Sequence, residues 1–272
     1  MLRVLLTNDD GIEADGLQAL RRALLEVPDV ELAVIAPDSN RSATARSITT
    51  RRPLWVEEVA FGDGSVGYAT DGTPVDCVRF AALGLVDGFK ADLIVSGINH
   101  GSNLGDDITY SGTVAAALEG VVLGIPGLAI SQQSRAREMD FRLGNAFDFE
   151  AAAAFTARVV EEIDDVPLPS GTLLNINVPS GEIAGVEVAR LGKRIYRDQL
   201  ALVDEESGRR QYRIYGDAPD YHHEDGTDLA AVAEGRIAVT PLHFDLNDRP
   251  GIETLQAYDL ARLLQPAATE LE

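Results

Sequence analysis

The chain has little cysteine, little lysine and no long hydrophobic run. Its single cysteine, Cys77, excludes an internal disulfide framework and a zinc site built on several thiolates. No apolar stretch approaches the length of a membrane span, so we expect no membrane partner. The first predicted strand begins at residue 2 and leaves no room for a signal peptide, so we expect a cytoplasmic protein.

Basic residues are scarce relative to acidic ones. The 272 residues include 23 lysines and arginines and 44 aspartates and glutamates, which gives a net charge of -21. This charge argues against nucleic-acid polymers and anionic membranes as partners. It would also repel an anionic substrate, unless a bound metal ion or oriented N–H groups invert the local field.

Apolar strands and amphipathic helices alternate along the first two thirds of the chain. A buried strand over residues 2–6 precedes a helix over 15–25 and a second strand over 31–36. A helix between two apolar strands is typical of a parallel βαβ unit. We therefore predict an α/β fold built on a parallel sheet, with a main unit over residues 1–180.

The character of the sequence changes beyond Pro179. Strands are predicted over residues 186–191 and 212–215, on either side of an acidic turn. Such an extended hairpin would expose Tyr196, Tyr212 and Tyr215, so we interpret it as an arm used in oligomerisation; an ordinary surface hairpin is the alternative.

A closing helix is predicted over residues 253–264. With the hairpin, it would form a smaller C-terminal region over residues 181–272.

Two adjacent carboxylates, Asp9 and Asp10, follow the first strand directly. Ligands of open α/β sheets bind in the crevice outside the carboxyl ends of the strands. Neighbouring carboxylates repel each other, and a divalent cation would give the pair a purpose. A turn that leads into a helix N-cap is the alternative.

Polar residues also follow the next two strands. Asn40 and Ser42 lie in a loop rich in hydroxyls and amides after the second strand, and Asn99 ends a third buried strand. Carboxylate, hydroxyl and amide oxygens are hard ligands that suit Mg²⁺, Mn²⁺ or Ca²⁺. Such a cation beside oriented N–H groups suits the hydrolysis of a phosphate ester.

A glycine-rich loop follows Asn99 and ends in Ser111, Gly112 and Thr113 at a predicted helix start. Free N–H groups and the helix dipole would favour a phosphate or carboxylate there. The loop matches neither the Walker motif nor the dinucleotide fingerprint. A long capped surface loop is the alternative.

Five blocks of the sequence resemble the signature blocks of the survival protein SurE family of nucleotidases and occur in the same order. They are TNDDG (7–11), APDSNRS (36–42), GTPVDC (72–77), SGIN (96–99) and NLGDDITYSGTVAAA (103–117).

The resemblance implies a Rossmann-like parallel-sheet core with helices on both faces and an extended β-hairpin arm near the C-terminus. It also implies a homodimer or homotetramer. By motif position, the metal ligands would be Asp9, Asp10, Ser42 and Asn99, and the first two would also be the catalytic carboxylates. The phosphate-binding residues would be Asn40, Ser111, Gly112 and Thr113.

The implied activity is metal-dependent hydrolysis of nucleoside 5'- or 3'-monophosphates, with Mg²⁺ or Mn²⁺ as the cofactor and Ca²⁺ as a cation that crystals could hold. A nucleotide-binding sensor without hydrolysis and a protein that mainly hydrolyses polyphosphate are the alternatives. A receiver module needs a lysine after the fifth strand, and neither Lys90 nor Lys193 is suitably placed. A haloacid-dehalogenase-type phosphatase needs an acid two residues after its nucleophile, and Asp9 and Asp10 have none there.

Overall fold

The computed structural model describes residues 1–139, 146–214 and 219–264. Within these ranges, nine strands form one mixed sheet in the order β3-β4-β2-β1-β5-β6-β7-β13-β8. The strands are β1 (Leu2–Thr7), β2 (Val30–Pro37), β3 (Val56–Ala60), β4 (Val66–Thr70), β5 (Leu93–His100), β6 (Gly127–Gln132), β7 (Thr172–Val178), β8 (Gly185–Val188) and β13 (Arg236–His243).

The remaining elements surround this sheet or project from it. The α-helices are α1 (Asp15–Leu25), α2 (Pro74–Ala82), α3 (Gly112–Val122), α4 (Glu150–Glu161), α5 (Asp228–Ala233) and α6 (Arg249–Gln256). Two 3-10 helices are η1 (Gly105–Tyr110) and η2 (Leu260–Leu264), and the short strands are β9 (Arg194–Ile195), β10 (Ala201–Glu206), β11 (Arg209–Arg213) and β12 (Asp220–Tyr221).

Strand β1 is buried on both faces, as its continuous apolar run predicts. Val4 and Leu6 belong to an apolar cluster that includes residues of α1 and α4, whereas Leu5 belongs to a second cluster with residues of α2 and α3. Successive side chains of a strand point to opposite faces, so one apolar run serves two cores. The predicted α/β fold with helices on both faces is confirmed.

The central strands β4, β2, β1, β5, β6 and β7 are parallel, while β3 and β13 pair antiparallel with β4 and β7. The boundary predicted at residue 180 falls between β7 and β8, which belong to the same sheet. Thus β8 and β13 extend the sheet that the first 180 residues begin.

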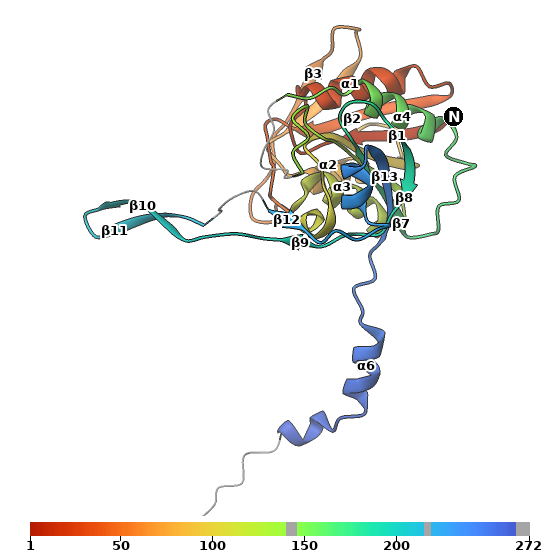
Figure 1. Cartoon of the computed structure of the whole chain (residues 1–272). Helices are drawn as coiled ribbons and strands as arrows, with labels where there is room; N and C mark the ends of the chain where they lie inside the picture. The colour runs from red at the N-terminus through yellow and green to blue at the C-terminus, as the bar shows by residue number, and fades with distance from the viewer. Residues whose placement is uncertain (140–145, 215–218, 265–272) are drawn as a thin grey trace, which may run out of the picture.

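The predicted hairpin exists, but its first strand was misplaced. The hairpin pairs β10 with β11 and projects far from the body, whereas β8 pairs parallel with β13 in the sheet (Figure 1). Tyr196 precedes the hairpin and its hydroxyl donates a hydrogen bond to Asp107. Tyr215, also assigned to the hairpin, lies outside the described residues.

The closing helix is shorter than predicted and begins earlier. Pro250 occupies the first turn of α6, a position that suits proline because the first helical N–H groups have no partner within the helix. The segment then continues as η2, and no side chain of α6 or η2 is buried. Both elements extend away from the sheet (Figure 1).

Candidate active site

The strand order places the polar strand ends together. β1 lies between β2 and β5, and it is parallel to both. The chain continues from β1 to β2 on one side, whereas the later strand β5 lies on the other side of β1. Such a reversal of strand order opens a crevice at the carboxyl ends of β1 and β5. The loops after β1 and β2 and the end of β5 itself supply the predicted metal ligands to this crevice.

Asp9 is almost completely buried, with 3% of its surface exposed. Its Oδ1 accepts a hydrogen bond of 2.5 Å from the Thr113 hydroxyl, and its backbone carbonyl accepts one of 2.6 Å from the N–H of Arg41. Asp9 thus joins the loop after β1 to the first turn of α3 and to the loop after β2.

Gly112 lets helix α3 begin directly against Asp9. A Cβ atom at residue 112 would lie 2.7 Å from the Asp9 Cβ and 2.8 Å from its Oδ2, closer than real Cβ contacts. Ser111 is the N-cap, and its hydroxyl accepts a hydrogen bond from the Val114 N–H at 3.1 Å. The predicted Ser-Gly-Thr segment therefore does begin a helix, and it faces the first carboxylate.

Asp10 is held at both carboxylate oxygens. Oδ1 accepts a hydrogen bond of 3.0 Å from the side-chain amide of Asn40, and Oδ2 accepts one of 3.1 Å from the His100 N–H. The amide oxygen of Asn40 in turn accepts a hydrogen bond of 2.9 Å from the Ser42 N–H. Asn40 therefore fixes the position of Asp10 relative to Ser42.

The four predicted metal ligands line two adjoining cavities. Asp9, Ser42 and Asn99 line one of them with Ser111, while Asp10 and Ser42 line the other with Asn40. The amide nitrogen of Asn99 donates to the Gly101 carbonyl at 2.6 Å, so its amide oxygen is the atom left to accept. The structure brings together all eight site residues that the sequence predicted.

The acidic pair is electrostatically strained. Burial raises the pKa of Asp9, and the neighbouring carboxylate of Asp10 raises it further. Burial also raises the pKa of Asp10, against the lowering effect of its hydrogen bonds from His100 and Asn40. A cation bound between the two carboxylates would offset the repulsion of their negative charges.

The donors present fit a hard divalent cation. Two carboxylates, one hydroxyl and one amide oxygen are the oxygen ligands that Mg²⁺ and Mn²⁺ accept. In the part of the chain that the structure describes, no cluster of three or more His, Cys, Asp or Glu side chains could hold a metal ion. The predicted set instead takes half its donors from Ser42 and Asn99.

The model of the family described as "Survival protein SurE" matches residues 4–198. The chain belongs to the SurE family. The resemblance read from the five sequence blocks is thereby confirmed.

Relatives of this SurE-family chain match over nearly its full length. The protein named 5'-nucleotidase SurE from Rubrobacter xylanophilus is 51% identical over 97% of this chain and 99% of its own. The protein of the same name from Chloroflexus aggregans is 46% identical over 94% and 98%. The crystal structure of the SurE protein from Aquifex aeolicus has a TM-score of 0.77 and 37% identity, and the match covers 94% of this chain and 98% of that one.

The sequence interpretation assigned no role to Asn103, although it lines the cavity with Asp9 and Asn99. Its N–H donates to Asn177 at 2.8 Å, its side-chain amide donates to Ser131 at 2.8 Å, and its carbonyl accepts from Asn175 and Asn177 at 2.9 Å each. These partners come from β6 and β7. The sequence signal for Asn103 is its position at the start of the block over residues 103–117. Its hydrogen-bond partners are 28 to 74 residues away in the sequence, so no local pattern connects them.

Arg194 of β9 was also missed. Its side chain is fully buried and its Nε donates to Asp107 at 2.7 Å, while its backbone N–H donates to Asp106 at 2.9 Å. Asp107 lines the same cavity as Asp9, so the root of the projecting hairpin touches the loop that forms the site.

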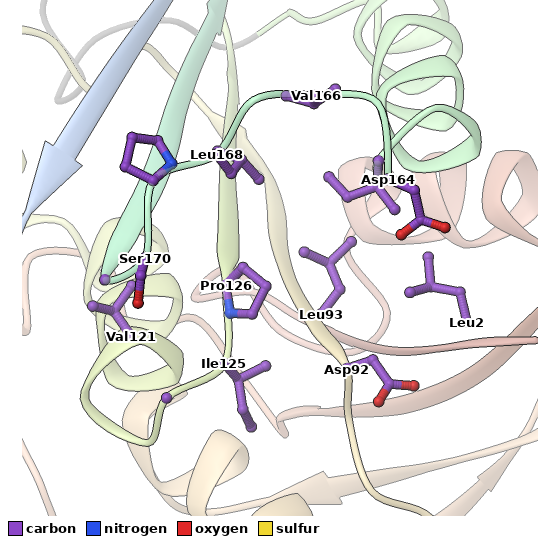
Figure 2. Close-up of a pocket in the computed structure, with 14 residues that line it drawn as sticks. Leu2, Asp92, Leu93, Val121, Ile125, Pro126, Asp164, Val166, Leu168 and Ser170 are labelled. Carbon is purple, nitrogen blue, oxygen red and sulfur yellow. The ribbon is translucent and has the colours of Figure 1, made fainter.

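A larger cavity, whose lining residues are drawn in Figure 2, lies at the amino ends of the central strands. Leu2 and Leu93 line it where β1 and β5 begin, together with Pro126 and Ser170 ahead of β6 and β7. Its carboxylates, Asp92 and Asp164, come from separate segments, and Asp92 is paired with Arg3 at 2.7 Å. It contains none of the predicted site residues.

No helix within the described ranges is both long enough and apolar enough to cross a membrane.

Proposed function

We propose that this SurE-family protein is a metal-dependent phosphatase that hydrolyses nucleoside 5'- or 3'-monophosphates to nucleoside and phosphate. The observation that carries the proposal is the pair of adjacent carboxylates, buried Asp9 held at the first turn of α3 and partly buried Asp10 held by Asn40. Relatives up to 51% identical carry the name 5'-nucleotidase SurE, which supports the same reaction.

Asp9, Asp10, Ser42 and Asn99 would hold the cation, which we propose to be Mg²⁺ or Mn²⁺, with Ca²⁺ able to occupy the same ligands in crystals. When bound, such a cation supplies positive charge for phosphate oxygens and a water of lowered pKa. A bound cation would also offset the electrostatic repulsion between the protein, whose net charge is -21, and an anionic substrate.

The protein's own groups would position the phosphate and move the proton. Asn40, Ser111, Gly112 and Thr113 would surround the phosphate, because the N-terminus of α3 presents backbone N–H groups and the positive end of the helix dipole. Asp9 or Asp10 would orient the attacking water and accept its proton.

We further propose a homodimer or homotetramer formed through the hairpin β10–β11. Every residue of both strands is exposed, including Leu202, Val203 and Tyr212. An exposed apolar hairpin of this kind favours a partner surface, and a second copy of the chain would provide one. The cytoplasmic location expected from the sequence stays a prediction.

The substrate class is tested by phosphate release from 5'-AMP, 3'-AMP and a short polyphosphate, with Mg²⁺ or Mn²⁺ present. Release from the nucleotides at the higher kcat/KM supports the proposal. Faster release from polyphosphate would favour the polyphosphatase alternative. Binding of AMP without any release would favour the sensor.

A further inference from the structure

Three aromatic rings lie beside the acidic pair. His100 lies 5.2 Å from Phe147 and 4.9 Å from Phe149, measured between ring centroids, and the two phenylalanines lie 5.8 Å apart. The planes of His100 and either phenylalanine differ by 29°, and those of the phenylalanines by 16°. The rings therefore present nearly parallel faces.

The positions of two of these rings, His100 and Phe149, are fixed by neighbouring elements. His100 ends β5, and its Nε2 accepts a hydrogen bond of 3.4 Å from the Gly16 N–H at the start of α1. A Cβ atom at residue 16 would lie 2.1 Å from the Ile98 carbonyl oxygen and 3.2 Å from a ring atom of Phe149, so the glycine lets both β5 and this ring lie against α1. Phe149 is the N-cap of α4 and packs against the main core.

Phe147 differs from its two neighbours. Like both neighbours it is partly exposed, but unlike Phe149 it is absent from the apolar clusters of the core that the described residues form. Ring packing alone would give His100 and Phe149 a structural purpose, but it does not explain a phenylalanine held at the edge of a cavity. A ligand with a flat face that stacks on the ring would explain this position.

The cavity at this edge is continuous with the predicted phosphate and metal residues. All three rings line it together with Asp10, Asn40 and Ser42, and its volume is about 350 Å³. In a nucleotide, only the ribose separates the base from the phosphate. A phosphate held at Asn40 therefore leaves the base close to the rings.

We propose that Phe147, supported by His100 and Phe149, is the platform on which the nucleobase of the substrate stacks. The inference rests on the proposed function and names the part of the molecule that recognises the base. Stacking uses the flat face that every base has, so the platform accepts different bases and adds affinity for nucleotides over phosphate esters that have no base.

The test compares the wild-type protein with Phe147→Ala, with the conservative variant Phe147→Trp, and with Phe80→Ala as a control. Phe80 is a partly buried phenylalanine of α2 that packs against the core and does not line this cavity. Two esters are compared, AMP and ribose 5-phosphate, because the second lacks the base. Binding of adenosine, which lacks the phosphate, is followed separately by NMR titration.

Phe147→Ala is expected to raise KM for AMP and to weaken adenosine binding, each by about tenfold, as the loss of one base–aromatic stack predicts. It should leave kcat/KM for ribose 5-phosphate within about twofold, and Phe147→Trp should restore AMP kinetics. Equal losses for the two esters, or unchanged adenosine binding, would overturn the platform. If the wild type released phosphate from neither ester, the hydrolase proposal would fail, while the adenosine titration would still decide whether Phe147 binds the base.

Discussion

The hydroxyl of Thr113 donates a 2.5 Å hydrogen bond to Oδ1 of Asp9, across 104 residues of sequence. This bond joins the first turn of α3 to the loop after β1 and occupies one oxygen of the proposed metal ligand. Hydrogen bonds to a ligating carboxylate orient it and tune its affinity for the metal. Thr113 is therefore expected to act on the cation through Asp9.

Thr113→Val removes the hydroxyl and keeps the shape of the side chain. We expect metal affinity or kcat to fall by about 10- to 100-fold, the usual cost of losing a partner of a metal ligand. Titration of activity with Mn²⁺ measures the effect. Thr113→Ser should recover most of it.

The matched control is Thr156→Val on α4, because Thr156 is also buried and its hydroxyl also makes one hydrogen bond, to the Ala152 carbonyl at 2.8 Å. It should leave metal affinity unchanged. The same loss in Thr156→Val would mean that Thr113 matters only for helix stability.

Without metal, the acidic pair should make stability depend on pH. Because burial raises the pKa of Asp9 and Asp10 in the folded protein, their protonation favours folding. That stability is fully present below the unfolded pKa, about 4, and is lost as pH rises through the higher folded pKa. Chelator-treated Asp9→Asn should therefore have a higher Tm than wild type at pH 8, and a smaller difference between pH 5 and pH 8.

Asp92→Asn is the control for this prediction. Arg3 lowers the pKa of Asp92, so its charge favours folding above the unfolded pKa. This variant should not raise Tm at pH 8. If Asp9→Asn instead lowered Tm at pH 8, the account of a strained pair would be wrong.

The buried pair of Arg194 and Asp107 connects the root of the hairpin to the site. Arg194→Met removes a fully buried guanidinium from the Asp107 carboxylate, and breaking such a pair costs roughly 3–5 kcal/mol. Urea unfolding measures the loss, and AMP turnover should fall with it because Asp107 lines the cavity of Asp9.

Arg197→Met is matched to it, since Arg197 pairs with Asp220 at 2.7 Å on the surface. An exposed pair is worth at most about 1 kcal/mol. Equal effects of the two substitutions would show that burial of the Arg194 pair is unimportant.

The hairpin is expected to set the oligomeric state. Replacing residues 201–213 with a short glycine-serine turn removes β10 and β11. Both strands are exposed, and neither belongs to the nine-stranded sheet. The molar mass from light scattering should fall, while circular dichroism keeps the α/β spectrum. An unchanged mass would exclude the hairpin as the oligomer contact.

Local patterns predicted the elements that carry the site. The apolar run of β1 and the helix start at Ser111, Gly112 and Thr113 are signals contained within a few residues, and the structure has both. The predicted site residues converge because parallel strands share a carboxyl edge.

Contacts between distant segments could not be predicted in this way. Arg194 meets Asp107 across 87 residues, and Phe147 meets His100 only after the chain has passed through β6. The first strand of the hairpin was misplaced for the same reason, because no local sequence pattern indicates that residues 185–188 pair with β13. Periodicity identifies a strand, but not its partner.

The central claim is most directly tested by metal add-back. The chelator-treated wild-type protein, kept in molar KCl because of its net charge of -21, is given Mg²⁺, Mn²⁺ or Ca²⁺ singly, and phosphate release from AMP is measured. Our account predicts no release without metal and recovery with Mg²⁺ or Mn²⁺. Undiminished release from the metal-free protein would contradict it.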